Sequence, residues 1–173
     1  VHIVTVGASL ASNYERDKAR ESISEVDIEK KLTKITEAER TQYGKELLRY
    51  VQDKEAAGDL AKVSAELNGL SRYFKEISMV YLIHTDTNLG KCCAEALRSF
   101  LLTKDKQVPE PIEIEGLHSQ ETFQKGLSNL IKKVAHLLAQ HRKVRLCATG
   151  GFKPEVALAS VLGFIAKAPV YYI

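Results

Sequence analysis

The chain has 173 residues, of which 45% are hydrophobic and 27% are charged. This balance is typical of a single globular domain that can bury a sizeable core. The formal net charge of +3 is too small to indicate binding of duplex nucleic acid. The sequence contains neither an apolar run of about 18 residues, which a membrane span requires, nor a signal peptide.

Cysteine usage indicates a reducing compartment. Cys92, Cys93 and Cys147 have no spacing typical of a metal site, and their odd number argues against a disulfide framework. We interpret them as reduced core residues of a cytoplasmic protein. Both ends of the chain fall in strand-like runs, so we expect a neighbouring segment, and a membrane tether located there is not excluded.

The first part of the chain predicts a strand followed by helices. The apolar run at 2–6 reads as a strand and stops at a small-residue turn at 7–9. A polar region at about 14–58 has apolar residues at helical spacing, with Ser12 and Asn13 as candidate caps. We interpret these helices as an amphipathic cover over a sheet, and a lid or a dimer arm is the alternative.

The middle of the chain predicts a helix, a buried strand and another helix. Asp59 is a candidate cap for one helix with an apolar stripe over 60–74. The nearly continuous apolar run at 77–83 is typical of a strand covered on both faces, as in parallel sheets. A polar turn at 84–90 precedes a helix at 91–102, and this turn suits a ligand site and a helix cap equally well.

The last third continues the same alternation. It predicts a short edge strand at 112–114, a long helix capped by Ser119, a strand at 144–148, a helix from about 155 and a strand at 170–173. This order predicts an α/β, Rossmann-like, doubly wound and mostly parallel sheet with helices on both faces. We expect one domain over 1–173, with a helical insertion at about 14–76.

The stretch 144–156 has the pattern of a strand, a glycine loop and a helix N-terminus. Such a turn presents backbone N–H groups to an anion, and Lys153 adds a positive charge there. An ordinary tight strand-to-helix turn is the equally weighted alternative. The spacing does not match a Walker loop.

Three turns rich in small polar residues follow the carboxyl ends of predicted strands. Because these ends share one edge of a parallel sheet, we expect the turns to form one site. Their hydroxyls, amides and single ammonium group suit phosphates and ribose, and a sole acidic residue predicts no metal. No GxGxxG motif is present, which disfavours a conventional dinucleotide fold. The candidate ligand-binding residues are Gly7, Ala8, Ser9, Thr85, Asp86, Thr87, Asn88, Thr149, Gly150, Gly151, Phe152 and Lys153.

Four features together resemble the CRISPR-associated Rossmann-fold (CARF) domains, in the branch of type III effectors and stand-alone ring nucleases. They are an opening strand ending in Gly-x-Ser, the segment Ser64-Ala65-Glu66-Leu67-Asn68, the motif Thr85-Asp86-Thr87 with Gly90, and Thr149-Gly150-Gly151-Phe152-Lys153. The resemblance covers essentially the whole chain.

The resemblance implies a two-fold homodimer that binds cyclic oligoadenylate, most often the tetra-adenylate, across the dimer axis, without a metal or cofactor. Ser9 would contact phosphate or ribose. The Thr85–Thr87 motif would line the adenine and ribose pocket. The turn at 149–152 would supply amides to phosphates, and Lys153 would neutralise charge.

Two functions follow from the resemblance. In the first, the chain is a sensor whose effector, a nuclease or a membrane segment, lies outside it. In the second, it is a metal-independent ring nuclease in which a ribose 2′-hydroxyl attacks the adjacent phosphorus, with Ser9 orienting the hydroxyl and Lys153 stabilising the oxyanion. The three turns offer no visible general base, and the sensor is the preferred interpretation. A Rossmann-like nucleotide binder outside CRISPR immunity is the third alternative.

Overall fold

A computed structural model gives the fold of residues 1–19, 23–117, 119–150 and 153–171. Its centre is a parallel sheet of five strands in the order β3-β2-β1-β4-β5. The strands are β1 (His2–Thr5), β2 (Val80–Thr85), β3 (Ile112–Ile114), β4 (Arg145–Cys147) and β5 (Val170–Tyr171).

The strand order reverses between β1 and β4. The chain builds β1, β2 and β3 toward one edge, and then returns past β1 to add β4 and β5 on the other side. Val4 on β1 therefore faces Leu82 on one neighbour and Cys147 on the other. This reversal is the switch point at which open parallel sheets bind ligands.

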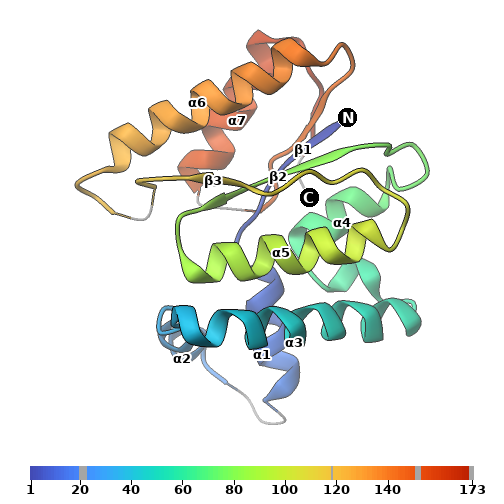
Figure 1. The fold of residues 1–173 in the computed structure, drawn as a ribbon, viewed down its shortest axis with the longest axis vertical. Helices are drawn as coiled ribbons and strands as arrows, with labels where there is room; N and C mark the ends of the chain where they lie inside the picture. The colour runs from blue at the N-terminus through green and yellow to red at the C-terminus, as the bar shows by residue number, and fades with distance from the viewer. Residues whose placement is uncertain (20–22, 118, 151–152, 172–173) are drawn as a thin grey trace.

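Helices cover both faces of the sheet (Figure 1). The helices α6 and α7 lie on one face, α4 and α5 lie on the other, and α3 packs outside α5 as a further layer. The doubly wound, Rossmann-like α/β prediction is confirmed. The helices are α1 (Ser9–Lys18), α2 (Glu25–Leu32), α3 (Glu37–Ala56), α4 (Ala65–Ser71), α5 (Asn88–Leu102), α6 (Phe123–Gln140) and α7 (Lys153–Ile165), with a short 3₁₀ turn η1 (Leu60–Lys62).

Alternating side chains divide the interior into two cores. Val4 and Leu82 belong to the core beneath α5, whereas Ile3 and Ile83 belong to the core beneath α6 and α7. Each of these side chains is at least 97% buried, which stabilises the fold by about 1.5–3 kcal/mol per residue. Such two-sided burial explains why the apolar run of β2 is nearly continuous.

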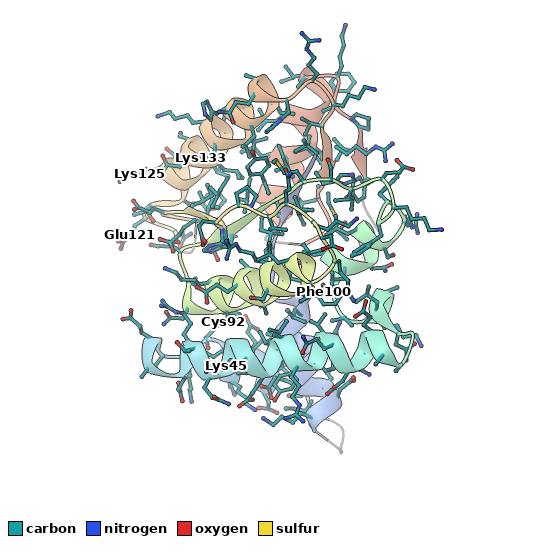
Figure 2. The ribbon with its side chains drawn as sticks, turned by 45° about the vertical axis from the view of Figure 1, so that its right-hand side comes forward. Lys45, Cys92, Phe100, Glu121, Lys125 and Lys133 are labelled. Atoms are coloured by element: carbon teal, nitrogen blue, oxygen red, sulfur yellow. The ribbon has the colours of Figure 1, made fainter. Side chains whose placement is uncertain are left out.

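The segment predicted at 14–58 forms helices, and the longest of them, α3, packs mainly against α5 and not directly on the sheet. Leu47 and Val51 of α3 are fully buried in the same core as Phe100 of α5. The thiol of Cys92 donates to the carbonyl of Arg40 on α3 at 3.4 Å, and Cys92 and Phe100 lie where the two helices meet (Figure 2). All three cysteines are free and buried, as predicted.

One predicted helix is divided into two. Asp59 makes no side-chain capping hydrogen bond and precedes only the short turn η1. The side chain of Ser64 instead accepts a hydrogen bond from the Leu67 N–H at 3.1 Å and starts a new helix, α4. A serine cap inside the apolar stripe therefore breaks the continuous helix that the spacing predicted.

Three other element starts differ from the sequence expectation. The helix α1 begins at Ser9, so Ser12 and Asn13 lie inside it, and α6 begins at Phe123, so Ser119 does not cap it. The strand β2 begins at Val80, which pairs with His2, the first residue of β1, rather than at Ile77. Among the described residues, no helix is both long enough and apolar enough to cross a lipid bilayer.

We predict that His2 makes stability fall as the pH falls below 6.5. Burial, with smaller effects from neighbouring positive charges, lowers the pKa of His2 to about 4. Between these values the unfolded chain binds more protons than the folded one, so stability rises with pH, by about 1–2 kcal/mol between pH 5 and 6.5.

The check is chemical denaturation at several pH values for the wild type and for His2→Gln, which cannot titrate. The wild type should show the steeper pH dependence. His136→Gln, an exposed position on α6, is the matched control and should follow the wild type. Identical slopes for wild type and His2→Gln would contradict the prediction.

Candidate functional site

The loops after β1 and β4 meet at the switch point of the sheet. The hydroxyl of Thr5, the last residue of β1, donates to the backbone carbonyl of Gly150 and, at 3.4 Å, to that of Cys147. The loop after β2 lies beside the β1 loop, since Val6 N–H donates to the Ile83 carbonyl at 2.7 Å. The parallel sheet therefore brings the described parts of the three predicted turns to one edge.

A buried carboxylate, Glu66 of α4, lies between the β1 and β4 loops. Its side chain is fully buried. Oε1 accepts a hydrogen bond from the Gly7 N–H at 2.7 Å, and Oε2 accepts one from the Ser9 hydroxyl at 2.8 Å. A carboxylate withdrawn from water needs such donors, because burying a charge without partners is strongly unfavourable.

Glu66 stands in one of the motifs that carry the family resemblance, but the sequence alone gives it no role at the site. The predicted site consists of turns that follow strands, whereas Glu66 comes from a helix distant in sequence. The signal was present, because Glu66 follows Val63 by three residues and precedes Leu70 by four, which places an acidic residue on the buried stripe.

The hydroxyl of Ser9 is held on two sides. It donates to Glu66 Oε2 at 2.8 Å and accepts a hydrogen bond from the Ala65 N–H at 3.0 Å. Both partners belong to the start of α4, so this helix sets the orientation of the hydroxyl. Ser9 itself stays partly exposed at the first turn of α1.

Most side chains of the turn after β2 have partners within the protein. The hydroxyls of Thr85 and Thr87 are 3.0 Å apart, and Thr87 caps α5 by accepting from the Gly90 N–H. The Asp86 carboxylate accepts from the Gly116 N–H at 3.0 Å, after β3. The helix-cap interpretation of Thr87 is confirmed, and Asp86 joins the loops after β2 and β3.

Asn88 connects this turn to the outer helices. Its side-chain amide donates to the carbonyl of Ile35 at 3.1 Å, in the connection between α2 and α3. The N-terminus of α5 and the helical segment are thus tied at the edge where the candidate site lies.

The predicted strand, glycine loop and helix at 144–156 are present as β4 and α7. Thr149 follows β4, and its hydroxyl lies 3.4 Å from the Cys147 thiol. Gly151 and Phe152 lie outside the described residues, as does the side chain of Lys153, the first residue of α7. The first N–H groups of a helix have no partner within the helix and suit an anion.

Near this edge, burial favours the neutral forms of the Cys93 and Cys147 thiols and of the His84 imidazole. Burial, reinforced by the negative charge of Glu66, raises the pKa of Cys93 and of Cys147. Burial lowers the pKa of His84, whose Nδ1 lies 2.7 Å from the Thr85 carbonyl. In the described part of the chain, no cluster of three His, Cys, Asp or Glu side chains is arranged to hold a metal ion.

Hollows in the described part of the chain also lie away from this edge. One of about 740 Å³ is at the amino-terminal edge of the sheet, where Arg145 is already held by Glu76 at 2.9 Å and stacks on Tyr73. The other, about 410 Å³, lies among α1, α2 and α3 near Tyr43. Because ligands of open parallel sheets bind outside the carboxyl ends, we assign the candidate site to the opposite edge from the larger hollow.

The fold and this edge define an α/β protein of the doubly wound, Rossmann-like class, with a candidate ligand site at its switch point. Residues 61–173 match the model of the CRISPR-associated protein family Cas_APE2256. The chain belongs to this family, which indicates a role in CRISPR defence. The matched stretch contains Glu66 and the loops after β2 and β4, whereas Ser9 precedes it.

We predict that Gly150→Ala destabilises the protein. A Cβ at this position would lie 1.9 Å from Glu66 Oε1 and 2.8 Å from the Thr5 carbonyl oxygen. Neither the buried carboxylate nor the strand backbone can yield without losing hydrogen bonds, so we expect a loss of about 1–3 kcal/mol.

Gly44→Ala is the matched control, because a Cβ there meets nothing within 4 Å in the middle of α3. This control should stabilise the protein by about 0.5–1 kcal/mol through helix propensity. Denaturant unfolding measures both variants. A Gly150→Ala protein as stable as the wild type would show that the loop does not hold Glu66 closely.

Proposed function

We propose that this protein is the sensor domain of a type III CRISPR antiviral effector. Its ligand is cyclic oligoadenylate, with the tetra-adenylate ring as the expected form, bound across a homodimer cleft. The observation that carries the proposal is the meeting of the β1 loop, Glu66 and the β4 loop at the switch point, in a member of a CRISPR-associated family. The effector would lie in a neighbouring segment.

The polar groups at this edge match the alternating phosphates and nucleosides of a cyclic oligoadenylate. The N-terminus of α7 and the positive charge of Lys153 suit phosphate. The partly exposed hydroxyl of Ser9 and the turn after β2 offer polar groups for ribose and base. Metal ions are not required, because binding such a ring needs only positioning and charge neutralisation.

An apolar face of α7 supports the homodimer part of the proposal. Val161, Phe164 and Ile165 are 53%, 86% and 70% exposed. Apart from its first turn, α7 carries no charged residue, and a helix that is apolar all round is normally buried. Because α7 starts at the β4 loop, a two-fold interface along α7 would bring the two copies of the site together, which suits a ring with two-fold symmetry.

We predict that Phe164→Glu converts a dimer to a monomer, because a charge would be placed in an apolar interface. Sedimentation velocity of the wild type should give a dimer at micromolar concentration, and the variant should sediment as a monomer. Val26→Glu is the matched control, since Val26 is 57% exposed on α2, and it should stay dimeric. A dimeric Phe164→Glu protein would exclude this face as the interface.

A ring nuclease is the second candidate, and the contact between Ser9 and Glu66 favours it. A 2′-hydroxyl would attack the adjacent phosphorus, the 5′-oxygen would leave, and a linear product with a 2′,3′-cyclic phosphate would form. A carboxylate 2.8 Å from the Ser9 hydroxyl supplies a proton acceptor that the three turns did not offer.

One incubation separates the functions. Purified protein is mixed with cyclic tetra-adenylate without divalent metal, binding is measured by calorimetry and the nucleotide is analysed by chromatography. Tight binding of an intact ring supports the sensor, and conversion to linear di-adenylate supports the nuclease. Absence of binding would contradict both.

We predict that Lys153→Ala weakens ring binding about 10- to 100-fold, the effect of losing a charge-assisted hydrogen bond of about 1.5–3 kcal/mol. Lys167→Ala, beyond the other end of α7, is the matched control and should bind like the wild type. Unchanged affinity of Lys153→Ala would remove this residue from the site.

A further inference from the structure

The hydrogen-bonding capacity of Ser9 is almost fully used. A hydroxyl has one hydrogen to donate and two lone pairs that accept. The hydrogen is directed at Glu66 Oε2, 2.8 Å away, and one lone pair accepts from the Ala65 N–H at 3.0 Å. One lone pair remains on a residue that is partly exposed at the site edge.

An ionised carboxylate cannot reverse this arrangement, because it only accepts hydrogen bonds. Its other oxygen is fixed by the Gly7 N–H at 2.7 Å, and the whole side chain is buried. The backbone of Gly150 also lies close to this oxygen, since a Cβ there would be 1.9 Å from Oε1. Ser9 can therefore accept one further hydrogen bond but cannot donate one.

We infer that Glu66 determines ligand specificity by fixing Ser9 as a hydrogen-bond acceptor, so that the β1 side of the site selects a ribose 2′-hydroxyl. A phosphate oxygen has no proton to offer and cannot use the remaining lone pair. A 2′-hydroxyl donates, and it is the group that distinguishes RNA from DNA. This inference rests on the proposed function and decides between the phosphate and ribose contacts expected for Ser9.

Substitution of Glu66 by glutamine should reverse the polarity of Ser9 with almost no change in shape. The Gly7 N–H still needs an acceptor, so the amide oxygen takes the position of Oε1 and the NH₂ group faces Ser9. The two lone pairs of Ser9 are then occupied by this NH₂ group and by the Ala65 N–H. The hydroxyl hydrogen becomes free to point at the ligand.

The test compares two ligands, cyclic tetra-adenylate and its 2′-fluoro analogue. The analogue keeps a ribose-like sugar pucker but cannot donate from the 2′ position. The measured quantity is the ratio of the analogue's dissociation constant to that of the natural ring, at low temperature with the ring verified intact. We expect a ratio of about 10 for the wild type, from the loss of one hydrogen bond at a site that then leaves an unpaired group.

Ser9→Ala and Glu66→Gln should both bring the ratio to about 1 while still binding the ring. Glu15→Gln is the matched control, because Glu15 is also buried and also accepts a hydroxyl hydrogen bond, from Tyr43 at 3.0 Å in the helical layer. It should keep the wild-type ratio.

Tight binding by the wild type with a ratio near 1 would overturn this inference and leave the proposed function standing. A Glu66→Gln protein that keeps the wild-type ratio while Ser9→Ala loses it would show that Glu66 does not set the polarity of Ser9. If the wild type binds neither ring, the proposed function fails and the inference fails with it. Should Glu66→Gln not fold, Ser9→Ala still tests the contact, and a ratio that stays near 10 in that variant overturns the inference.

Discussion

The buried carboxylate of Glu66 is the constraint on which the carboxyl edge of the sheet depends. Removing a charge from water is strongly unfavourable unless hydrogen-bond donors replace the water. Here the donors are the N–H of Gly7 and the hydroxyl of Ser9. The β1 loop must therefore take the path that presents them, and the β4 loop must have a glycine where it passes the carboxylate. One side chain from α4 thus fixes the relative position of both halves of the switch point.

The same edge is joined to the helical layers by side chains that are not part of the sheet. Asn13 of α1 donates to the carbonyl of Val63 at 3.0 Å, just before α4. Asn88 at the start of α5 donates to Ile35 in the connection between α2 and α3. A movement of the loops at the candidate site would therefore strain contacts of α1, of the residues just before α4 and of the connection between α2 and α3. The helical segment is more than a surface cover, since its contacts reach both sides of the site.

The fold could be predicted from the sequence because its signals are local. Apolar runs gave the strands, helical spacing gave the helices, and their alternation gave the parallel sheet. The errors arose where one side chain competes with a pattern, as when Ser64 caps α4 inside an apolar stripe. Glu66 was missed for a different reason. Its role depends on contacts with Gly7 and Ser9, nearly 60 residues earlier in the chain. The local spacing places Glu66 on the buried stripe but does not show which residues it contacts.

The contact between Ser9 and Glu66 also bears on how the two proposed functions, sensing and cleavage, are related. A hydroxyl held as an acceptor binds a 2′-hydroxyl by the same lone pair that would take its proton. The binding contact and the first step of cleavage are therefore one interaction. What distinguishes them is whether the 2′-oxygen is aligned with the bond to the leaving 5′-oxygen, and whether a cation at the start of α7 faces the charge that develops. If either proposed function holds, the β1 side of the site would provide recognition in both. Under the proposed function, the charge of Lys153 at the start of α7 is then the feature that would separate binding of an intact ring from its cleavage.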